Sequence, residues 1–344
     1  MKMLIMDNRR KDKMRELELI NKAKESALRG DLLDRDGIIA LLEIDPESQA
    51  CQALGKAARE VASVVCKDRA YLWAAIGLDY RACDMSCNYC SLGEEWGLVT
   101  EETEFTDEEI LELVKQFVDQ GVRWIVLRTT QYYSLDKAIE LSKKIKENVK
   151  GEYELGLNVG EFDNVLAKKM IDVGLEFVYH TLRLREGVDT KFDPAERLAT
   201  LDAISKSTLN LVSLVEPLGV EHTNEEIADA FLTAMKYGAT VTGCMERIPV
   251  EGTPLGKYPA ITEKRLAQVI AVTRLAAGTL APDICVHRAS ELSMEWGANV
   301  TVVETGAIPR DTCCSSKAEW RGFDPATAKK WFQSQGYEVF SKEK

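Results

Sequence analysis

Three cysteines fall within eight residues of the chain, at Cys83, Cys87 and Cys90, with the spacing C-x3-C-x2-C. Thiolates are soft ligands that favour iron–sulfur clusters and zinc, and the closed sites of both kinds use four ligands. The next cysteine after Cys90 is Cys244, so a fourth thiolate is missing nearby. Three thiolates on a four-iron cluster leave one iron open to bind another molecule. The alternatives are half of a zinc site or a chance clustering in a chain of nine cysteines.

Composition and charge limit the classes of protein to consider. The 344 residues are 45% hydrophobic and 29% charged, with a net charge of −12 and no basic tract, which argues against a nucleic-acid partner. The sequence has no run of about 18 apolar residues that could cross a membrane, and its short apolar start predicts no secretory signal. An odd number of cysteines, three of them clustered, favours the reducing cytoplasm over a disulfide framework.

The order of the predicted elements indicates an α/β fold. Residues 1–70 are predicted to form an N-terminal helical extension, with helices over Lys13–Arg29, over Gly37–Leu42 capped by Asp36, and after Asp45-Pro46. We expect this extension to form a lid or plug across one end of the fold. Residues 71–312 alternate strands with helices, and residues 313–344 form a short C-terminal tail with a helix near Ala326–Ser334.

Eight predicted strands are nearly continuous apolar runs, which is typical of a parallel sheet. They are Tyr71–Leu78, Arg123–Leu127, Tyr153–Leu157, Glu176–Leu182, Leu209–Val215, Ala239–Met245, Ile284–His287 and Val300–Glu304. Helices separate them, among them one that begins with a capping box of Thr106 and Glu109 and runs to Gln120. Eight such units predict a (βα)8 TIM-type barrel, with a doubly wound open sheet as the alternative.

Polar residues follow the predicted strands, where a barrel of this kind places its catalytic groups. After the cysteine loop these strand-end residues are Thr130, Asn158, His180, Arg183, Arg185, Glu216, Cys244, Cys285 and His287, with Cys313 and Cys314 beyond the last strand. We expect them to surround one site. The histidines are candidate proton carriers or substrate contacts, and Arg183 and Arg185 are candidates to hold an anionic group. Structural histidines and surface salt bridges are the alternatives.

The cysteine stretch resembles the radical S-adenosylmethionine (SAM) superfamily. In that superfamily the open iron of a [4Fe-4S] cluster chelates the amino and carboxylate groups of SAM, and an aromatic residue in the place of Tyr89 lies beside the adenine. Further stretches over residues 70–310 resemble biotin synthase and its relatives. They are Gly77-Leu78-Asp79, Gly174-Leu175-Glu176-Phe177 before Tyr179-His180, Ala195-Glu196-Arg197-Leu198, Ile248 to Leu255, and Trp296-Gly297-Ala298-Asn299.

The resemblance implies roles for individual residues. Cys83, Cys87 and Cys90 would hold the SAM cluster, and Arg197 would meet the SAM carboxylate. The remaining cofactor contacts would come from Tyr89, Thr130, Asn158, Arg183 and Glu216. The substrate contacts would come from His180, Arg185 and His287.

The chain also departs from the biotin synthase pattern. Common biotin synthases hold a second, two-iron cluster through cysteines on strands two, three and four, where this chain has Arg128-Thr129, Asn158-Val159 and His180-Thr181. The common second cluster therefore cannot form. Thiols occur instead on strands six and seven and past strand eight, at Cys244, Cys285, Cys313 and Cys314. We predict that they hold a different auxiliary iron–sulfur cluster, with inert thiols as the alternative.

Together these features predict a cytoplasmic radical SAM sulfurtransferase of biotin biosynthesis. It would insert sulfur from the auxiliary cluster into dethiobiotin, a small-molecule substrate. The electron donor would be flavodoxin or ferredoxin. The sequence leaves open whether the protein forms a homodimer. Relatives without sulfur insertion are alternatives: iron-hydrogenase maturation enzymes, the methylornithine synthase type and a cofactor-building methylase. Octanoyl sulfur insertion and a non-catalytic iron–sulfur carrier complete the alternatives.

Overall fold

The computed structural model describes residues 2–306 and 323–340, and within them eight parallel strands close into a barrel. In order around the barrel these are β1 (Arg69–Gly77), β4 (Trp124–Arg128), β5 (Glu154–Asn158), β6 (Phe177–Tyr179), β7 (Asn210–Val212), β9 (Ala239–Glu246), β10 (Asp283–His287) and β11 (Val300–Gly306). The last strand, β11, pairs with β1 from Tyr71↔Val300 to Gly77↔Gly306. This closure confirms the predicted (βα)8 TIM-type barrel and excludes the open sheet.

Both faces of the barrel strands are buried, which explains their apolar sequences. In β1, Trp73 and Ala75 belong to the cluster that fills the barrel interior. The alternate residues Leu72, Ala74 and Ile76 pack in the layer between the strands and the outer helices. Each strand therefore needs apolar side chains at nearly every position, unlike a strand with one face in water.

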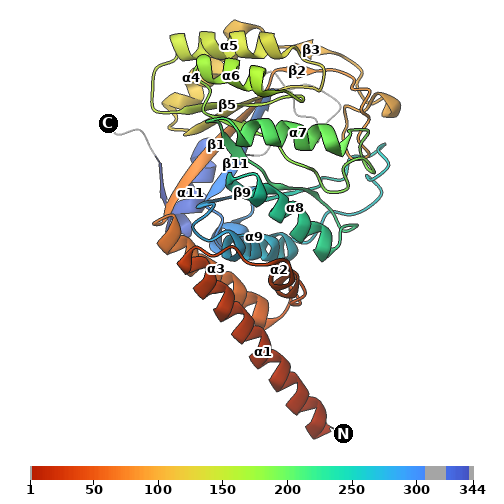
Figure 1. Ribbon diagram of the computed structural model, residues 1–344, viewed down its shortest axis with the longest axis vertical. Helices are drawn as coiled ribbons and strands as arrows, with labels where there is room; N and C mark the ends of the chain where they lie inside the picture. Colours follow the sequence, from red (N-terminus) through yellow and green to blue (C-terminus); the bar gives the residue numbers. More distant parts are fainter. Residues whose placement is uncertain (1, 307–322, 341–344) are drawn as a thin grey trace.

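Helices cover the outside of the barrel (Figure 1). They are α4 (Asp107–Asp119), α5 (Leu135–Asn148), α6 (Asn164–Asp172), α7 (Pro194–Ser205), α8 (Asn224–Lys236), α9 (Glu263–Ala277) and the short α10 (Glu291–Glu295). The predicted capping box at the start of α4 is present, because the Thr106 hydroxyl accepts from Glu109 N–H while the Glu109 carboxylate accepts from Thr106 N–H. No described helix is long and apolar enough to cross a membrane.

The predicted strand Leu209–Val215 is two strands in the structure, β7 and β8 (Val215–Leu218). Strand β8 pairs with β9 alone, at Val215↔Cys244 and Leu218↔Glu246, with a register shift between the two pairs. The break lets the chain continue past the end of the barrel strand β7. It carries Glu216 to the rim of the barrel, where the cysteine loop lies.

The N-terminal extension consists of α1 (Lys2–Arg29), α2 (Arg35–Leu42) and α3 (Gln49–Val65). The structure corrects the predicted capping residues of α2 and α3. Asp34, not Asp36, caps α2 by accepting from Gly37 N–H, and Ser48, rather than Asp45-Pro46, caps α3 by accepting from Cys51 N–H. Several residues able to cap a helix precede each start, and the local sequence does not choose between them.

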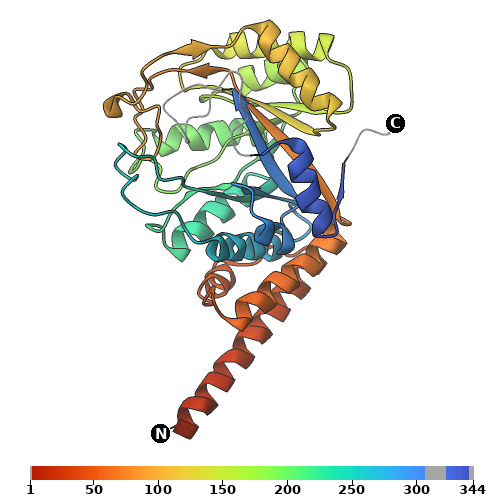
Figure 2. The same ribbon diagram turned by 180° about the vertical axis from the view of Figure 1, so that it is seen from behind.

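The extension packs along α8 and α9 on the outer wall of the barrel, and not across a barrel end as expected (Figures 1 and 2). With the barrel on one side and the extension on the other, α9 is buried at every position from Leu266 to Ala277. Gln268 in α9 donates to the carbonyls of Leu41, Leu42 and Ile44, which satisfies the open end of α2. The prediction of a lid was wrong, because the three helices bury their apolar faces against the apolar helix α9 and not against the loops at an end of the barrel.

The C-terminal part returns to the start of the barrel. Helix α11 (Pro325–Ser334), close to its predicted range, leads to β12 (Glu338–Val339), which pairs in parallel with Arg69 and Ala70 of β1. In Figure 2 α11 lies beside β1. The C-terminal part is therefore joined to the barrel at the beginning of its first strand.

A buried polar network joins α9 to the segment before β11. The Arg274 guanidinium is fully buried and donates to the carbonyls of Gly297 and Pro282 and, at 2.7 Å, to Asn299 Oδ1. The same Asn299 oxygen accepts from Ile284 N–H at 2.8 Å, while its amide nitrogen donates to Arg69 O and to Asp283 Oδ1. One asparagine thus ties together β1, β10 and α9.

We expect Asn299→Ala to lower the free energy of unfolding by about 1.5–3 kcal/mol, because the buried Arg274 guanidinium and Ile284 N–H lose their acceptor. Urea denaturation followed by circular dichroism measures the change. Asn148→Ala is the matched control, since the exposed Asn148 amide donates to Lys144 O and its loss should change the value by about 0.5 kcal/mol or less. Equal stabilities for the two variants would contradict this role of Asn299.

Candidate functional site

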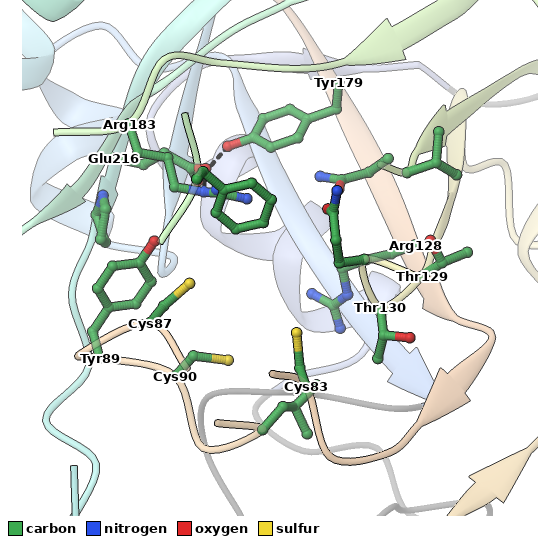
Figure 3. A pocket seen from close by; sticks show the side chains of 16 residues that line it. Cys83, Cys87, Tyr89, Cys90, Arg128, Thr129, Thr130, Tyr179, Arg183 and Glu216 are labelled. Atoms are coloured by element: carbon green, nitrogen blue, oxygen red, sulfur yellow. Dashed lines mark hydrogen bonds and ion pairs between the residues drawn. The ribbon is translucent and has the colours of Figure 1, made fainter. Parts of the chain in front are cut away.

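The cysteine loop begins just after β1 and lines a cavity at the C-terminal rim of the barrel. This first cavity encloses about 850 Å3 of space, part of it open to solvent. Among the residues predicted as ligands or cofactor contacts, it is lined by Cys83, Cys87, Tyr89, Cys90, Thr130, Asn158, Arg183 and Glu216. Figure 3 shows the three cysteine side chains directing their sulfur atoms into the same space. The structure therefore brings together residues from five segments that are far apart in sequence.

Backbone hydrogen bonds hold the cysteine loop in place. Cys83 N–H donates to Leu92 O at 2.7 Å, and Cys90 N–H donates to Cys87 O at 2.9 Å. Asn88, between the second and third cysteines, is bound by two other rim loops. Its N–H and side-chain amide donate to Asp189, and its carbonyl accepts from Leu255 N–H at 2.9 Å. These bonds fix the cysteine loop against two other rim loops.

Burial affects the chemistry of the three thiols. It raises the pKa of Cys87 to about 12 and also raises the pKa of Cys83. A buried thiol of this kind stays protonated until a metal displaces the proton. Within residues 2–306 and 323–340, no group of three or more Cys, His, Asp or Glu side chains converges on a single metal ion. Three thiols directed into one space fit a cluster in which each thiolate binds an iron of its own.

A cation and a carboxylate lie next to each other in the cavity wall. Arg183 Nε is 3.8 Å from Glu216 Oε1, and Glu216, only 4% exposed, also accepts from the Tyr179 hydroxyl. The Arg183 guanidinium stacks 4.9 Å from the centre of the Phe192 ring. Such a pair is complementary to the carboxylate and ammonium groups of an amino acid.

Two hydroxyl groups of the wall have no hydrogen-bond partner among the described residues. They belong to Tyr89 and Thr129, and both oxygen atoms are buried. Buried polar groups are nearly always hydrogen-bonded, so an unpaired one in a cavity wall points to a partner supplied by a ligand. The first cavity therefore fits a ligand with several polar groups besides its charged ends.

Asp79, which the sequence analysis named only within the Gly77-Leu78-Asp79 stretch and gave no role, supports the cavity wall from behind. It is 2% exposed, and its carboxylate accepts from the Thr130 N–H at 2.8 Å and from the Thr130 hydroxyl. Arg81 lies 3.2 Å from the same carboxylate. Asp79 thus fixes the loop after β4 against the start of the cysteine loop. An acidic residue directly after an apolar strand was the available signal.

Arg197 does not line the first cavity. The residue is 3% exposed, and its guanidinium is bound to Glu161 at 2.8 Å and to Glu186 at 3.3 Å. Glu186 also pairs with Arg183 at 3.4 Å. We therefore expect Arg197 to position Glu186 and, through it, Arg183, while direct contact with a cofactor stays a prediction from the resemblance alone.

The three predicted substrate contacts also lie outside the first cavity. Arg185 pairs with Asp189 at 3.4 Å. His180 is 2% exposed, and burial lowers its pKa well below the usual range, so its ring is neutral. His287 lines a second, neighbouring cavity.

The structure separates the two predicted auxiliary-cluster thiols that it describes. Cys244 packs in the layer beneath the outer helices, whereas Cys285 belongs to the cluster inside the barrel. In the β9–β10 register Cys244 is opposite Val286 and Gly243 is opposite Cys285, so the two thiols face opposite sides of the sheet. One cluster cannot bind both, which corrects the four-cysteine prediction. Cys313 and Cys314 lie outside the described residues.

Comparisons with known proteins identify distant relatives of the chain. No protein-family model matches the chain. It is 27% identical over 205 residues to the biotin synthase of Legionella pneumophila (strain Corby), covering 56% of this chain and 64% of that protein. It is 23% identical over 272 residues to the biotin synthase of Sulfurihydrogenibium sp. (strain YO3AOP1), covering 75% of this chain and 79% of that protein. The chain is related to the biotin synthases of the radical SAM superfamily.

Solved structures share the fold. Methylornithine synthase (PylB) matches with a TM-score of 0.75 at 18% identity, covering 92% of this chain and 97% of that one. HydG, a maturase of the [FeFe]-hydrogenase, matches with a TM-score of 0.76 at 15% identity, covering 97% and 79%. Radical SAM relatives imply a [4Fe-4S] cluster and SAM. The residues of the first cavity fit both groups. The three thiols could bind the cluster, and Arg183, Glu216 and the two unpaired hydroxyl groups, which line the same space, match the charged ends and polar groups of SAM.

We expect Arg183→Lys to weaken SAM binding roughly 10- to 100-fold, because lysine cannot make the forked pair with a carboxylate. Equilibrium dialysis with labelled SAM measures the dissociation constant. Arg35→Lys is the control, since the Arg35 side chain pairs with Asp229 on the outer surface, away from the cavity. An unchanged dissociation constant for Arg183→Lys would exclude Arg183 as the carboxylate-binding residue.

Proposed function

We propose that the protein is a radical SAM enzyme that removes a hydrogen atom from a small-molecule substrate. The observation that carries the proposal is the first cavity, where Cys83, Cys87 and Cys90 share one space with Arg183 and Glu216. A non-catalytic iron–sulfur carrier would not need an amino-acid-binding pair beside its cysteines. The relationship to biotin synthases supports the same assignment.

Each part of the cavity has a task in this proposal. With SAM bound, the cluster supplies one-electron cleavage of the sulfonium and so hydrogen-atom abstraction. Arg183 and Glu216 would hold the carboxylate and ammonium of SAM, and the Tyr89 side chain would contact its adenine. The buried Phe192 and Tyr89 side chains keep water away from the reacting groups. Reduced flavodoxin or ferredoxin would provide the electron.

Replacing Cys83, Cys87 or Cys90 by alanine should abolish SAM cleavage, because three thiolates are the minimum anchor of a four-iron cluster. The measurement is 5′-deoxyadenosine formation after anaerobic reconstitution with iron and sulfide. Cys66→Ala is the control, since the buried Cys66 thiol donates to Ala62 O beneath the outer helices, away from the cavity. Wild-type 5′-deoxyadenosine formation by any of the three cluster variants would refute the assignment.

We further propose that the reaction is sulfur insertion into dethiobiotin, as in a biotin synthase. The names of the relatives support this step. The sulfur donor would be an auxiliary iron–sulfur cluster on Cys313 and Cys314, with Cys285 as the described thiol that faces the barrel interior. Cys244 is no longer part of this set, because it faces the helices.

One observation favours the alternative without sulfur insertion. Among the described cysteines outside the cysteine loop, Cys285 alone packs in the barrel interior, and it is fully buried. A maturation or methylornithine-type reaction needs no sulfur donor, so in such an enzyme the Cys285 side chain would serve only to fill the barrel interior.

Cys313→Ala or Cys314→Ala should leave 5′-deoxyadenosine formation intact but stop biotin formation from dethiobiotin, because the substrate radical would meet no sulfur. The triple alanine variant of Cys83, Cys87 and Cys90 should still bind iron and sulfide. Cys244→Ala is the matched control and should keep both activities, since Cys244 packs beneath α9. Absence of iron from the triple variant would eliminate the auxiliary cluster, and sulfur insertion with it.

A further inference from the structure

A third cavity lies at the end of the barrel opposite the cysteine loop. It encloses about 570 Å3 of space, part of it open to solvent. Its lining includes the first residues of five barrel strands, namely Trp124, Glu154, Phe177, Asn210 and Asp283. Parallel strands begin at one end of a barrel, and the loops of the cofactor site follow them at the other end. This space, called the floor cavity below, is therefore separate from the first cavity.

Two acidic side chains face the floor cavity from different strands. In β5, Leu155 packs in the layer beneath the outer helices, so the preceding Glu154 points to the barrel interior. In β10, Ile284 packs in the helix layer in the same way, so Asp283 also points inward. Both carboxyl groups line the cavity. The alternation of the strands thus gives the floor cavity a negative charge.

The two carboxylates differ in their partners. Glu154 forms an ion pair with Arg123 Nη2 at 2.9 Å. The partner of Asp283 is a neutral amide, because Asn299 Nδ2 donates to Asp283 Oδ1 at 2.7 Å. A hydrogen bond from a neutral amide does not neutralise the charge of a carboxylate. Asp283 therefore leaves a negative charge in the cavity wall that a cation in the cavity could balance.

Aromatic rings form the apolar part of the same wall. Trp73, Trp124 and Phe177 line the floor cavity. Trp73 and Phe177 meet edge to face with ring centres 6.5 Å apart, and Trp124 stacks on Tyr71 at 5.0 Å. The face of an aromatic ring carries partial negative charge and attracts cations, most strongly in tryptophan. Rings and carboxylates in one wall consequently favour a ligand of the same kind.

We propose that the floor cavity binds a small organic cation, an ammonium group with alkyl substituents, at a site separate from that of SAM. The positive charge lies near Asp283 and Glu154. The alkyl groups lie against Trp73, Trp124 and Phe177. A cavity of this size is in the range of small-molecule sites. The inference is independent of the proposed function, because no residue of the floor cavity takes part in it.

The same lining disfavours other classes of ligand. An anion would meet two carboxylates. A primary ammonium presents three N–H donors that each need an acceptor, whereas Glu154 and Asp283 already accept from Arg123 and Asn299. A neutral apolar molecule would contact the rings but would leave the charge of Asp283 unbalanced. An alkylated ammonium has few donors to satisfy and brings the charge that the cavity lacks.

Isothermal titration calorimetry of the reconstituted, SAM-loaded protein with choline tests the inference. Its neutral isostere 3,3-dimethylbutan-1-ol has the same shape, with a carbon atom in place of the nitrogen. Asp283→Asn removes the charge and keeps an oxygen for the Asn299 amide, and Trp124→Leu removes one aromatic ring. Asp202→Asn is the matched control, since Asp202 pairs with Lys206 on α7, away from the floor cavity. Melting curves identify any variant that fails to fold.

We expect choline to bind at least tenfold more tightly than the neutral isostere. Its dissociation constant should rise about tenfold in Asp283→Asn, rise severalfold in Trp124→Leu and stay unchanged in Asp202→Asn. The dissociation constant of SAM should be the same with and without choline.

Three results would overturn the inference: no binding of choline to the wild type, equal binding of the neutral isostere, or displacement of SAM by choline. Wild-type affinity in a folded Asp283→Asn would overturn it as well. The comparison of choline with its isostere needs only the wild type, so it decides the matter even if both cavity variants fail to fold.

Discussion

Closure of the parallel barrel by the β1–β11 pairing is the constraint on which the site depends. All eight strands then end at one rim, and the loops that follow them have to meet there. The cysteine loop follows β1, Arg128 ends β4, and Asn158 ends β5. Residues separated by more than a hundred positions consequently share one cavity. An open sheet would have left the loops of its two edge strands far apart.

Charges buried at this rim form pairs and chains in which each carboxylate has a cationic or hydroxyl partner. Glu186 joins Arg183 to Arg197, Glu216 is held by Tyr179, and Glu304 joins Arg128 to His287. An isolated charge at such a depth would be strongly unfavourable, so the chains let the protein keep charged groups inside the barrel. They also place cations and anions side by side at the rim.

The features predicted correctly from sequence have local signals. The capping box at Thr106 and the apolar strands each occupy one short stretch. The three cysteines do so as well, and their role as cluster ligands stays a prediction. Features set by distant partners were missed. The side of the sheet to which the Cys244 side chain points depends on the register of β9. A shift of one residue would turn it from the helix layer to the barrel interior. The place of Arg197 depends on Glu161 and Glu186, and Glu304 has importance only beside Arg128 and His287. No single stretch contains these pairings.

The burial of α9 between the barrel and the N-terminal extension has a consequence for shortened forms of the chain. A chain that began at β1 would retain all eight barrel strands and the cysteine loop, yet it would expose the outward apolar face of α9 to water. An exposed apolar stripe of that length promotes self-association. Truncation at the apparent start of the barrel would thus yield an aggregating protein, and loss of activity in it would say nothing about catalysis. The helices before β1 act as a built-in solubilising cover.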